Sequence, residues 1–416
     1  MSEFSDAGVA ITGVGVTSAI GQGRDAFAAA LFDGAGAFGV MARPGRQNPA
    51  GDTRFLGAEL GELAMPSGIE PRELRHVSLS ARVALATLDE AWRGAALDQV
   101  DPERIALVVG GSNLQQREQA QVFARYAGRE AFVSPAYAMS FMDTDLCGVL
   151  TRQFGIKGSA CTVGGASASG QLAVIHAAQA VRSGQCDVAI ALGALMDLSH
   201  WECQALRSLG AMGSDRFAEA PALACRPFDL DHDGFIYGEC CAALVVERIG
   251  RAAAPARGGV QPYARLAGWH VAMDANRNPD PSLDGEKRAI DGALRAARLS
   301  AAEIDYVNPH GTGSLVGDAT ELAALRESGL AHARLNATKS LVGHGLTAAG
   351  AVEVVATLVQ MRAHRLHPTR NLEVPIDAGF GWVGAAAQPH TIHHALTLSM
   401  GFGGINTALC LTRIHS

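Results

Sequence analysis

The sequence predicts an α/β protein built from two similar halves. The chain has 416 residues and 48% hydrophobic content, and a single core usually splits beyond about 250 to 300 residues. Short β-branched runs alternate with alanine-rich helical stretches, which is typical of buried sheets covered by helices. An Ala-, Pro- and Gly-rich connector follows residue 250. We therefore predict an N-terminal half of residues 1–250 and a C-terminal half of residues 260–416.

The elements follow in chain order from these patterns. A helix is expected at Val83–Trp92, and strands are expected at Val9–Gly13, Ile105–Gly111, Val188–Gly193, Ala242–Glu247 and Tyr263–Trp269. Both halves end in an apolar strand after a glycine-rich turn, and both hold a strand-turn-helix, which suggests an internal repeat. Around residues 34–70 and 112–145 Gly, Pro and Arg are mixed, so we predict surface or interface segments there.

Composition argues against several classes of protein. The net charge is −7 and the basic residues are scattered, which disfavours a nucleic-acid or membrane partner. The N-terminus lacks the features of a signal peptide, and we expect no apolar stretch of about 18 residues, which predicts a cytoplasmic protein. Eight cysteines without CxxC spacing predict reduced, buried thiols. Asp229, Asp231 and Asp233 imitate a calcium loop, but its twelfth position is Cys240, so no metal site is expected.

One segment places a side chain where nucleophiles are often found. Residues 158–170 contain Gly158-Ser-Ala-Cys161-Thr-Val-Gly-Gly-Ala-Ser167-Ala-Ser-Gly, which passes from a small-residue strand through a tight turn into a helix. Such an elbow holds a side chain at the positive end of a helix dipole. A packing turn in any α/β protein explains this segment alone equally well.

Three further motifs lie in the second half, each at the end of a strand or in a turn. A lone histidine in such a place is more often structural, but a glycine-rich turn can form an oxyanion site from its backbone N–H groups. The motifs are Pro-His310-Gly-Thr312-Gly-Ser314 with Asp318 and Glu321 after it, Lys339-Ser-Leu-Val-Gly-His344, and Met400-Gly-Phe402-Gly-Gly-Ile-Asn406.

In this order, over residues 8 to 413, the motifs together resemble the β-ketoacyl-acyl-carrier-protein synthases, or ketosynthases. The resemblance implies a thiolase-like duplicated fold with five layers, αβαβα, and a homodimer. It also implies a substrate carried on the phosphopantetheine of an acyl carrier protein, with no other cofactor. The family has a cysteine in the elbow, nine residues after a glycine, and Gly158 plus nine is Ser167. The helix that follows also has the family's length only if Ser167, and not Cys161, occupies the elbow.

The resemblance also implies roles for the other motif residues. His310 and His344 would donate hydrogen bonds to the thioester oxygen, and Lys339 would orient the site, paired with Glu321. Asp318 would support the loop, and Thr312 and Ser314 would contact the phosphopantetheine arm. Met400 and Phe402, with the backbone N–H of Ser167, would form the oxyanion hole and the acyl pocket. The family often has a gating phenylalanine where this chain has Met400.

Serine changes the chemistry that this site can perform. A thiol with a pKa of about 8.5 becomes a thiolate at a helix N-terminus, whereas a serine hydroxyl is far more basic and needs a close general base. Decarboxylation of a malonyl thioester needs no nucleophile, only donors that stabilise the enolate and a dry pocket. We therefore expect conversion of malonyl to acetyl carrier protein.

The elbow resembles that of the serine-containing decarboxylases of polyketide β-branching cassettes, whose product is used by an HMG-synthase-like partner. Two alternatives remain at this point. One is a condensing enzyme that uses Cys161 or a serine-linked acyl intermediate. The other is a non-catalytic subunit, like a chain-length factor, that shapes the tunnel of a partner ketosynthase.

Overall fold

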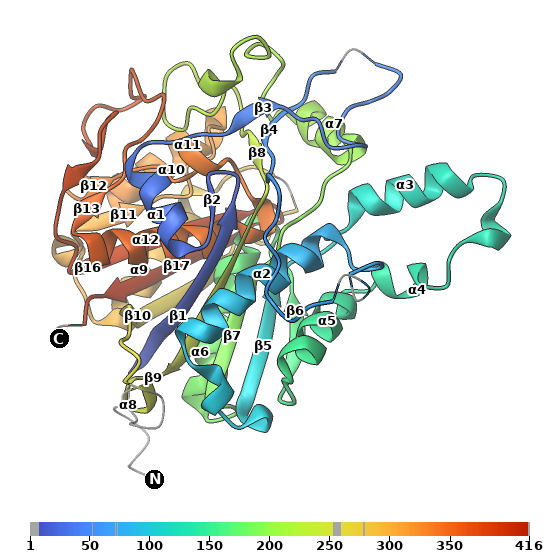
Figure 1. The fold of residues 1–416 in the computed structure, drawn as a ribbon. Coiled ribbons are helices and arrows are strands. Elements are labelled where there is room, and N and C mark those ends of the chain that lie inside the picture. The colour runs from blue at the N-terminus through green and yellow to red at the C-terminus, as the bar shows by residue number, and fades with distance from the viewer. Residues whose placement is uncertain are drawn as a thin grey trace.

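A mixed sheet of twelve strands runs through the molecule, in the order β14-β12-β11-β16-β17-β10-β1-β9-β7-β5-β6 with β2 beside β1 (Figure 1). The computed structural model describes residues 8–51, 53–70, 72, 74–252, 259–277 and 279–414. Part of the expected connector lies outside the described residues, so the boundary between the halves stays a prediction.

The two halves of the sheet have the same strand order. From the junction outward, the N-terminal half contains β1 (Val9–Ser18), β9 (Cys240–Arg248), β7 (Val188–Gly193), β5 (Ile105–Gly110) and β6 (Ala160–Val163). The C-terminal half contains β10 (Ala264–Met273), β17 (Ile405–Thr412), β16 (His394–Gly401), β11 (Tyr306–Asn308) and β12 (Arg334–Leu335). Among these five strands of each half, leaving out the two-residue strands β2 and β14, the first strand is followed by the fifth, fourth, second and third. This shared order supports the internal repeat suggested by the sequence.

Helices cover both faces of each half-sheet and produce the expected five layers. The outer layers are α2 (Leu79–Gly94) with α5 (Thr144–Phe154) on one side and α9 (Leu283–Ala297) with α10 (Leu315–Glu327) on the other, and the middle layer is α6 (Ser169–Ser183) with α12 (Ala349–Ala363). The two middle helices approach closely at Gly170, where an added Cβ would lie 2.6 Å from the Ala351 nitrogen.

One expectation about apolar segments was wrong. Residues Leu346–Ala363 form a stretch of 18 residues with mean hydropathy 1.2, long and apolar enough to cross a membrane. However, 89% of this window is buried inside the molecule, where α12 lies between the two half-sheets. A helix that is apolar all round is also what the core of a large protein requires. This apolar stretch is therefore part of the protein core.

The segment at 112–145, expected at the surface or at an interface, contains two helices. It forms α3 (Gln116–Tyr126) and α4 (Tyr137–Ser140), and Figure 1 shows this part extending away from the body of the molecule. The remaining helices are α1 (Arg24–Phe32), α7 (His200–Ser208), α8 (Ile249–Ala252) and α11 (Lys339–Val342). The short strands are β2 (Gly21–Gln22), β3 (Phe38–Val40), β4 (Leu56–Ala58), β8 (Tyr237–Gly238), β13 (Arg365–Leu366), β14 (Gly381–Trp382) and β15 (Gln388–Pro389).

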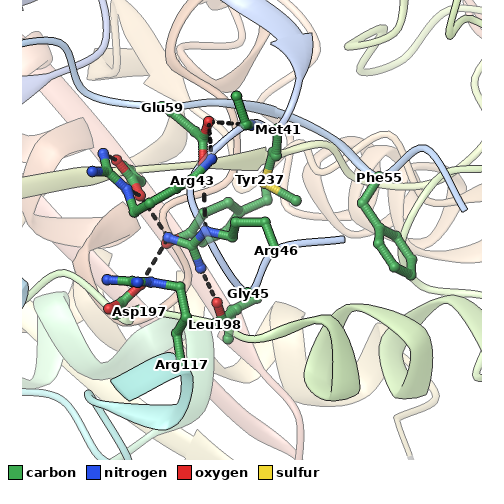
Figure 2. A network of polar contacts seen from close by, with 12 residues as sticks. Met41, Arg43, Gly45, Arg46, Phe55, Glu59, Arg117, Asp197, Leu198 and Tyr237 are labelled. Atoms are coloured by element: carbon green, nitrogen blue, oxygen red, sulfur yellow. Dashed lines mark hydrogen bonds and ion pairs between the residues drawn. The ribbon is translucent and has the colours of Figure 1, made fainter. Parts of the chain in front are cut away.

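The segment at 34–70, expected at the surface or at an interface, buries one arginine completely. Arg46 is 0% exposed, and its guanidinium lies 2.8 Å from Asp197 and 2.5 Å from Glu239 (Figure 2). The same group lies 5.0 Å from the centre of the Tyr237 ring. Tyr237 forms a parallel bridge with His344, so this network lies behind one of the expected site residues.

We predict that Arg46→Met lowers the free energy of unfolding by about 1.5–3 kcal/mol, because Asp197 and Glu239 each lose one charged hydrogen-bond partner and keep only Arg117 and Arg43, respectively. Urea denaturation measures the change. The control is Arg54→Met, since Arg54 pairs with Glu219 at side-chain exposures of 45% and 88%. That exposed pair contributes about 0–1 kcal/mol. Equal losses in both variants would contradict a stabilising role for the buried network.

Candidate active site

Ser167 occupies a strained turn between a strand and a helix. The turn Ala166–Ala168 connects β6 to α6, and Ala166 has a φ of 47°, which is unfavourable for a residue with a Cβ. The backbone carbonyl of Ser167 accepts a hydrogen bond from Ser399 Oγ at 3.1 Å. This turn is the elbow expected from the sequence. Cys161, by contrast, lies exposed on the edge strand β6.

The hydrogen bonds of His344 define which ring nitrogen carries the proton. Its Nδ1 accepts the backbone N–H of Leu346 at 3.2 Å, so in a neutral ring the proton is on Nε2. Burial, followed by the charge of Lys339, lowers the pKa of His344 well below its ordinary value. The ring is therefore neutral at pH 7, and its Nε2–H donates to Ser167 Oγ at 3.0 Å. A nitrogen that already carries a proton cannot deprotonate the serine.

His310 is held in the same state by Lys339. The ammonium of Lys339 lies 3.3 Å from His310 Nδ1 and also donates to the His310 carbonyl oxygen. Nδ1 is thus an acceptor, which again leaves the proton on Nε2. Burial, Lys339 and then His344 lower the pKa of His310 well below its ordinary value. The two imidazole rings are 5.4 Å apart between centroids and nearly perpendicular.

The expected pairing of Lys339 with Glu321 is wrong. Lys339 forms an ion pair with Glu353 of α12, and each side chain is 2% exposed. Burial raises the pKa of Glu353 to about 7, although Lys339 opposes this shift. Glu321 instead accepts the backbone N–H groups of His310 at 2.5 Å and Gly311 at 2.8 Å. It fixes the histidine's loop, whereas Glu353 fixes the lysine.

Asp318 and the two hydroxyl residues belong to the same loop. Asp318 Oδ1 accepts the N–H of Thr312 at 3.1 Å and of Gly313 at 3.0 Å. Thr312 Oγ1 donates to Ser314 Oγ at 3.0 Å. Two buried carboxyl groups, those of Asp318 and Glu321, therefore set the conformation of the turn after β11.

The expected site residues converge on one cavity of about 520 Å³. Ser167 and both histidines line it, together with Thr312, Ser314, Glu321, Met400 and Phe402. Apolar side chains form much of the remaining wall, and Phe235 contacts the His344 ring edge to face at 5.0 Å. Lys339 and Asp318 lie behind this lining. Cys161 does not line the cavity. Of the two candidate elbow residues, only Ser167 therefore does.

Sequence reasoning missed two groups that shape this site. Glu353 could have been found, because it is a single acid within the apolar run of α12, where an unpaired charge would be costly. Arg46 gave no such signal, because it lies in an irregular segment without periodicity. Its importance depends on the carboxylates of Asp197 and Glu239, which are far away in the sequence.

A strand-elbow-helix beside a second histidine-bearing turn, between two half-sheets of equal topology, defines a thiolase-like condensing-enzyme architecture. The description "Beta-ketoacyl synthase, N-terminal domain" matches residues 6–252, and "Beta-ketoacyl synthase, C-terminal domain" matches residues 263–373. The chain therefore belongs to the β-ketoacyl synthase family.

Relatives and solved structures of similar length agree. The chain is 58% identical over 407 residues to "Polyketide biosynthesis malonyl-ACP decarboxylase PksF" of Bacillus subtilis, covering 98% of this chain and 97% of the relative. It is 30% identical to "3-oxoacyl-[acyl-carrier-protein] synthase 2" of Mycobacterium leprae, covering 96% and 95%. A β-ketoacyl synthase structure from Burkholderia phymatum is similar at TM-score 0.88 and 28% identity, covering 98% and 100%.

We predict that Lys339→Met lowers the free energy of unfolding by about 3–5 kcal/mol, because Glu353 loses its buried partner. The double variant Lys339→Met/Glu353→Met should recover most of this stability, since no unpaired charge remains. It should not recover turnover, because His310 Nδ1 still lacks its donor. Urea denaturation measures the stability of each variant, and the conversion of malonyl carrier protein measures its turnover. Recovery of both in the double variant would show that Lys339 has only a structural role.

Proposed function

We propose that this protein decarboxylates malonyl-acyl carrier protein to acetyl-acyl carrier protein. The observation that carries the proposal is the pair of neutral Nε2–H donors, His310 and His344, beside a serine that no base activates. The 58% identity to a relative named as a malonyl-ACP decarboxylase supports the same reaction.

The proposed mechanism uses the cavity as follows. The phosphopantetheine arm enters past Thr312 and Ser314. The thioester oxygen replaces Ser167 Oγ as the acceptor of the His344 Nε2–H and also accepts the His310 Nε2–H. The bond between C2 and the carboxylate breaks, carbon dioxide leaves, and the electron pair becomes an enolate whose oxygen both histidines stabilise. The apolar wall favours loss of the charged carboxylate. A proton added at C2 then gives the acetyl thioester.

Ser167 has a specific part in this proposal. A thiol at this helix N-terminus would ionise and accept an acyl group, but the Ser167 hydroxyl receives a hydrogen bond from His344 and keeps its own proton. Condensation therefore stops before its first step. The position of Cys161, outside the cavity, counts against a condensing enzyme that uses that thiol.

We further propose where this reaction is used. The acetyl carrier protein would serve an HMG-synthase-like partner in polyketide β-branching, as the resemblance of the elbow implies. A cytoplasmic location is consistent with eight free cysteines, seven of them buried. No cofactor other than the carrier's phosphopantetheine is needed by this mechanism.

We predict that the protein converts malonyl carrier protein to acetyl carrier protein, seen as the loss of carbon dioxide in the intact mass of the carrier. His310→Ala and His344→Ala should each slow conversion by about 10²–10³-fold, because removal of one enolate donor costs about 2.7–4 kcal/mol. His332→Ala, on an exposed turn, is the control. No conversion by the wild-type protein would refute the function, and full activity in both site variants would refute the mechanism.

We also propose that the protein is a homodimer. Among the described residues, strand β6 ends the sheet, and two of its four residues are exposed, so its backbone edge is available for pairing. The neighbouring 112–145 segment exposes large apolar side chains, including Phe123 at 62% and Phe132 at 75%. Apolar exposure of this kind, next to a free sheet edge, is typical of an interface.

Light scattering after size exclusion should give twice the chain mass of 43.2 kDa. Phe123→Glu/Phe132→Glu should shift the protein to the monomer, because a charge would be buried at the interface. Leu230→Glu, at an exposed leucine outside this segment, should leave the dimer intact. A monomeric wild-type protein would rule out the proposed assembly.

A further inference from the structure

A buried glutamate lines the cavity without a role in the site described so far. Glu286 lies in the first turn of α9 and is 2% exposed, and it faces the same cavity as Ser167 and His310. Its Oε2 atom is buried and has no hydrogen-bond partner among the described residues. An ionised carboxylate is costly in such a place, whereas a protonated carboxyl is tolerated far better.

The groups that face Glu286 are mainly other acids. Asp274 follows β10, and Asp318 and Glu321 belong to α10; Asn406 of β17 donates to Asp274 Oδ1 at 2.9 Å. Two cations of this region bind other partners. Arg288 pairs with Asp284 at 2.8 Å and lies 3.8 Å from Asp274, and Lys339 pairs with Glu353. Burial, and then the charges of Glu321, Asp274 and Asp318, raise the pKa of Glu286 well above its ordinary value. Burial with an unpartnered Oε2 among acidic neighbours therefore favours the protonated form of Glu286.

The proposed reaction requires a proton that the two histidines do not provide. Each histidine is neutral and uses its single N–H to hold the enolate oxygen. A phosphopantetheine arm in the cavity also restricts the entry of bulk water. An acid that is already inside the cavity would meet this need.

We propose that Glu286 is the proton donor that converts the acetyl enolate to the acetyl thioester, an inference that rests on the proposed decarboxylation. The C2–carboxylate bond breaks, carbon dioxide leaves, and the electron pair passes to the enolate. The Glu286 carboxyl then gives its proton across the cavity, and a C2–H bond forms as the enolate becomes a carbonyl. Glu286 is left as a carboxylate, which takes a new proton from solvent after the carrier leaves. One proton is consumed in each turnover.

The test is a pH profile of single turnovers. Excess protein is mixed with malonyl carrier protein between pH 5.5 and 9, and acetyl carrier protein is measured by intact mass. The protonated form of Glu286 is the active one, so the wild-type rate should be level at low pH and fall as pH rises through the raised pKa. A wild-type rate that stays level to pH 9 overturns the proposal.

Variants are needed to assign the fall in rate at alkaline pH to Glu286, because burial also raises the pKa of neighbouring Glu321 to about 8. Glu286→Gln, of the same shape, should convert about 100-fold more slowly at pH 7 and lose the alkaline fall. Glu286→Asp keeps an acid and should retain the fall at a reduced rate, even if the glutamine variant does not fold. Asp284→Asn, on the exposed side of the same helix turn, is the control and should match the wild type.

The outcomes separate this proposal from the proposed function. A wild-type protein that leaves the malonyl carrier unchanged refutes the function itself. A wild-type protein that converts it, with Glu286→Gln equally fast and with the same pH profile, refutes only the role of Glu286. A slow glutamine variant that keeps the alkaline fall assigns Glu286 a structural role and also refutes proton donation.

Discussion

The buried ammonium of Lys339 is the constraint on which the rest of the site depends. Lys339 and its partner Glu353 are each 2% exposed, so the ion pair must be formed inside the folded protein. Burial, reinforced by the nearby Lys339 ammonium, lowers the pKa values of His310 and His344 and keeps both rings neutral. The Lys339 ammonium also donates to His310 Nδ1, which fixes the proton of that ring on Nε2.

This arrangement explains why a single atom in the elbow changes the reaction. Two Nε2–H donors stabilise negative charge on a substrate oxygen equally well beside a cysteine or a serine. They cannot, however, remove a proton from the elbow residue. A thiol in the elbow can ionise without a base because the helix N-terminus lowers its pKa, and a hydroxyl cannot. Under the proposed mechanism, the site therefore retains enolate chemistry and loses acyl transfer.

The parts that the sequence predicted depend on local patterns. Apolar runs defined β5, β7 and β9. Counting against the spacing of the family that the motifs resemble distinguished Ser167 from Cys161. The partner of Lys339 was wrong because an ion pair depends on tertiary packing. Glu321 is the acid of its own motif, yet its oxygens are already used by two backbone N–H groups. Only the packing of α12 makes Glu353 available.

The duplicated fold explains how the site is assembled between the halves. Each half has a strained residue in the turn before its central helix. These residues are Ala166, with a φ of 47°, before α6, and Leu346, with a φ of 49°, before α12. Because the two helices pack together, the two turns meet, and the hydroxyl of one half lies 3.0 Å from the imidazole of the other. Hydrogen-bond donors and the elbow thus come from equivalent places in a repeated unit. The acids around Glu286 all come from the C-terminal half. These carboxyl groups therefore lie on one side of the junction between the two halves.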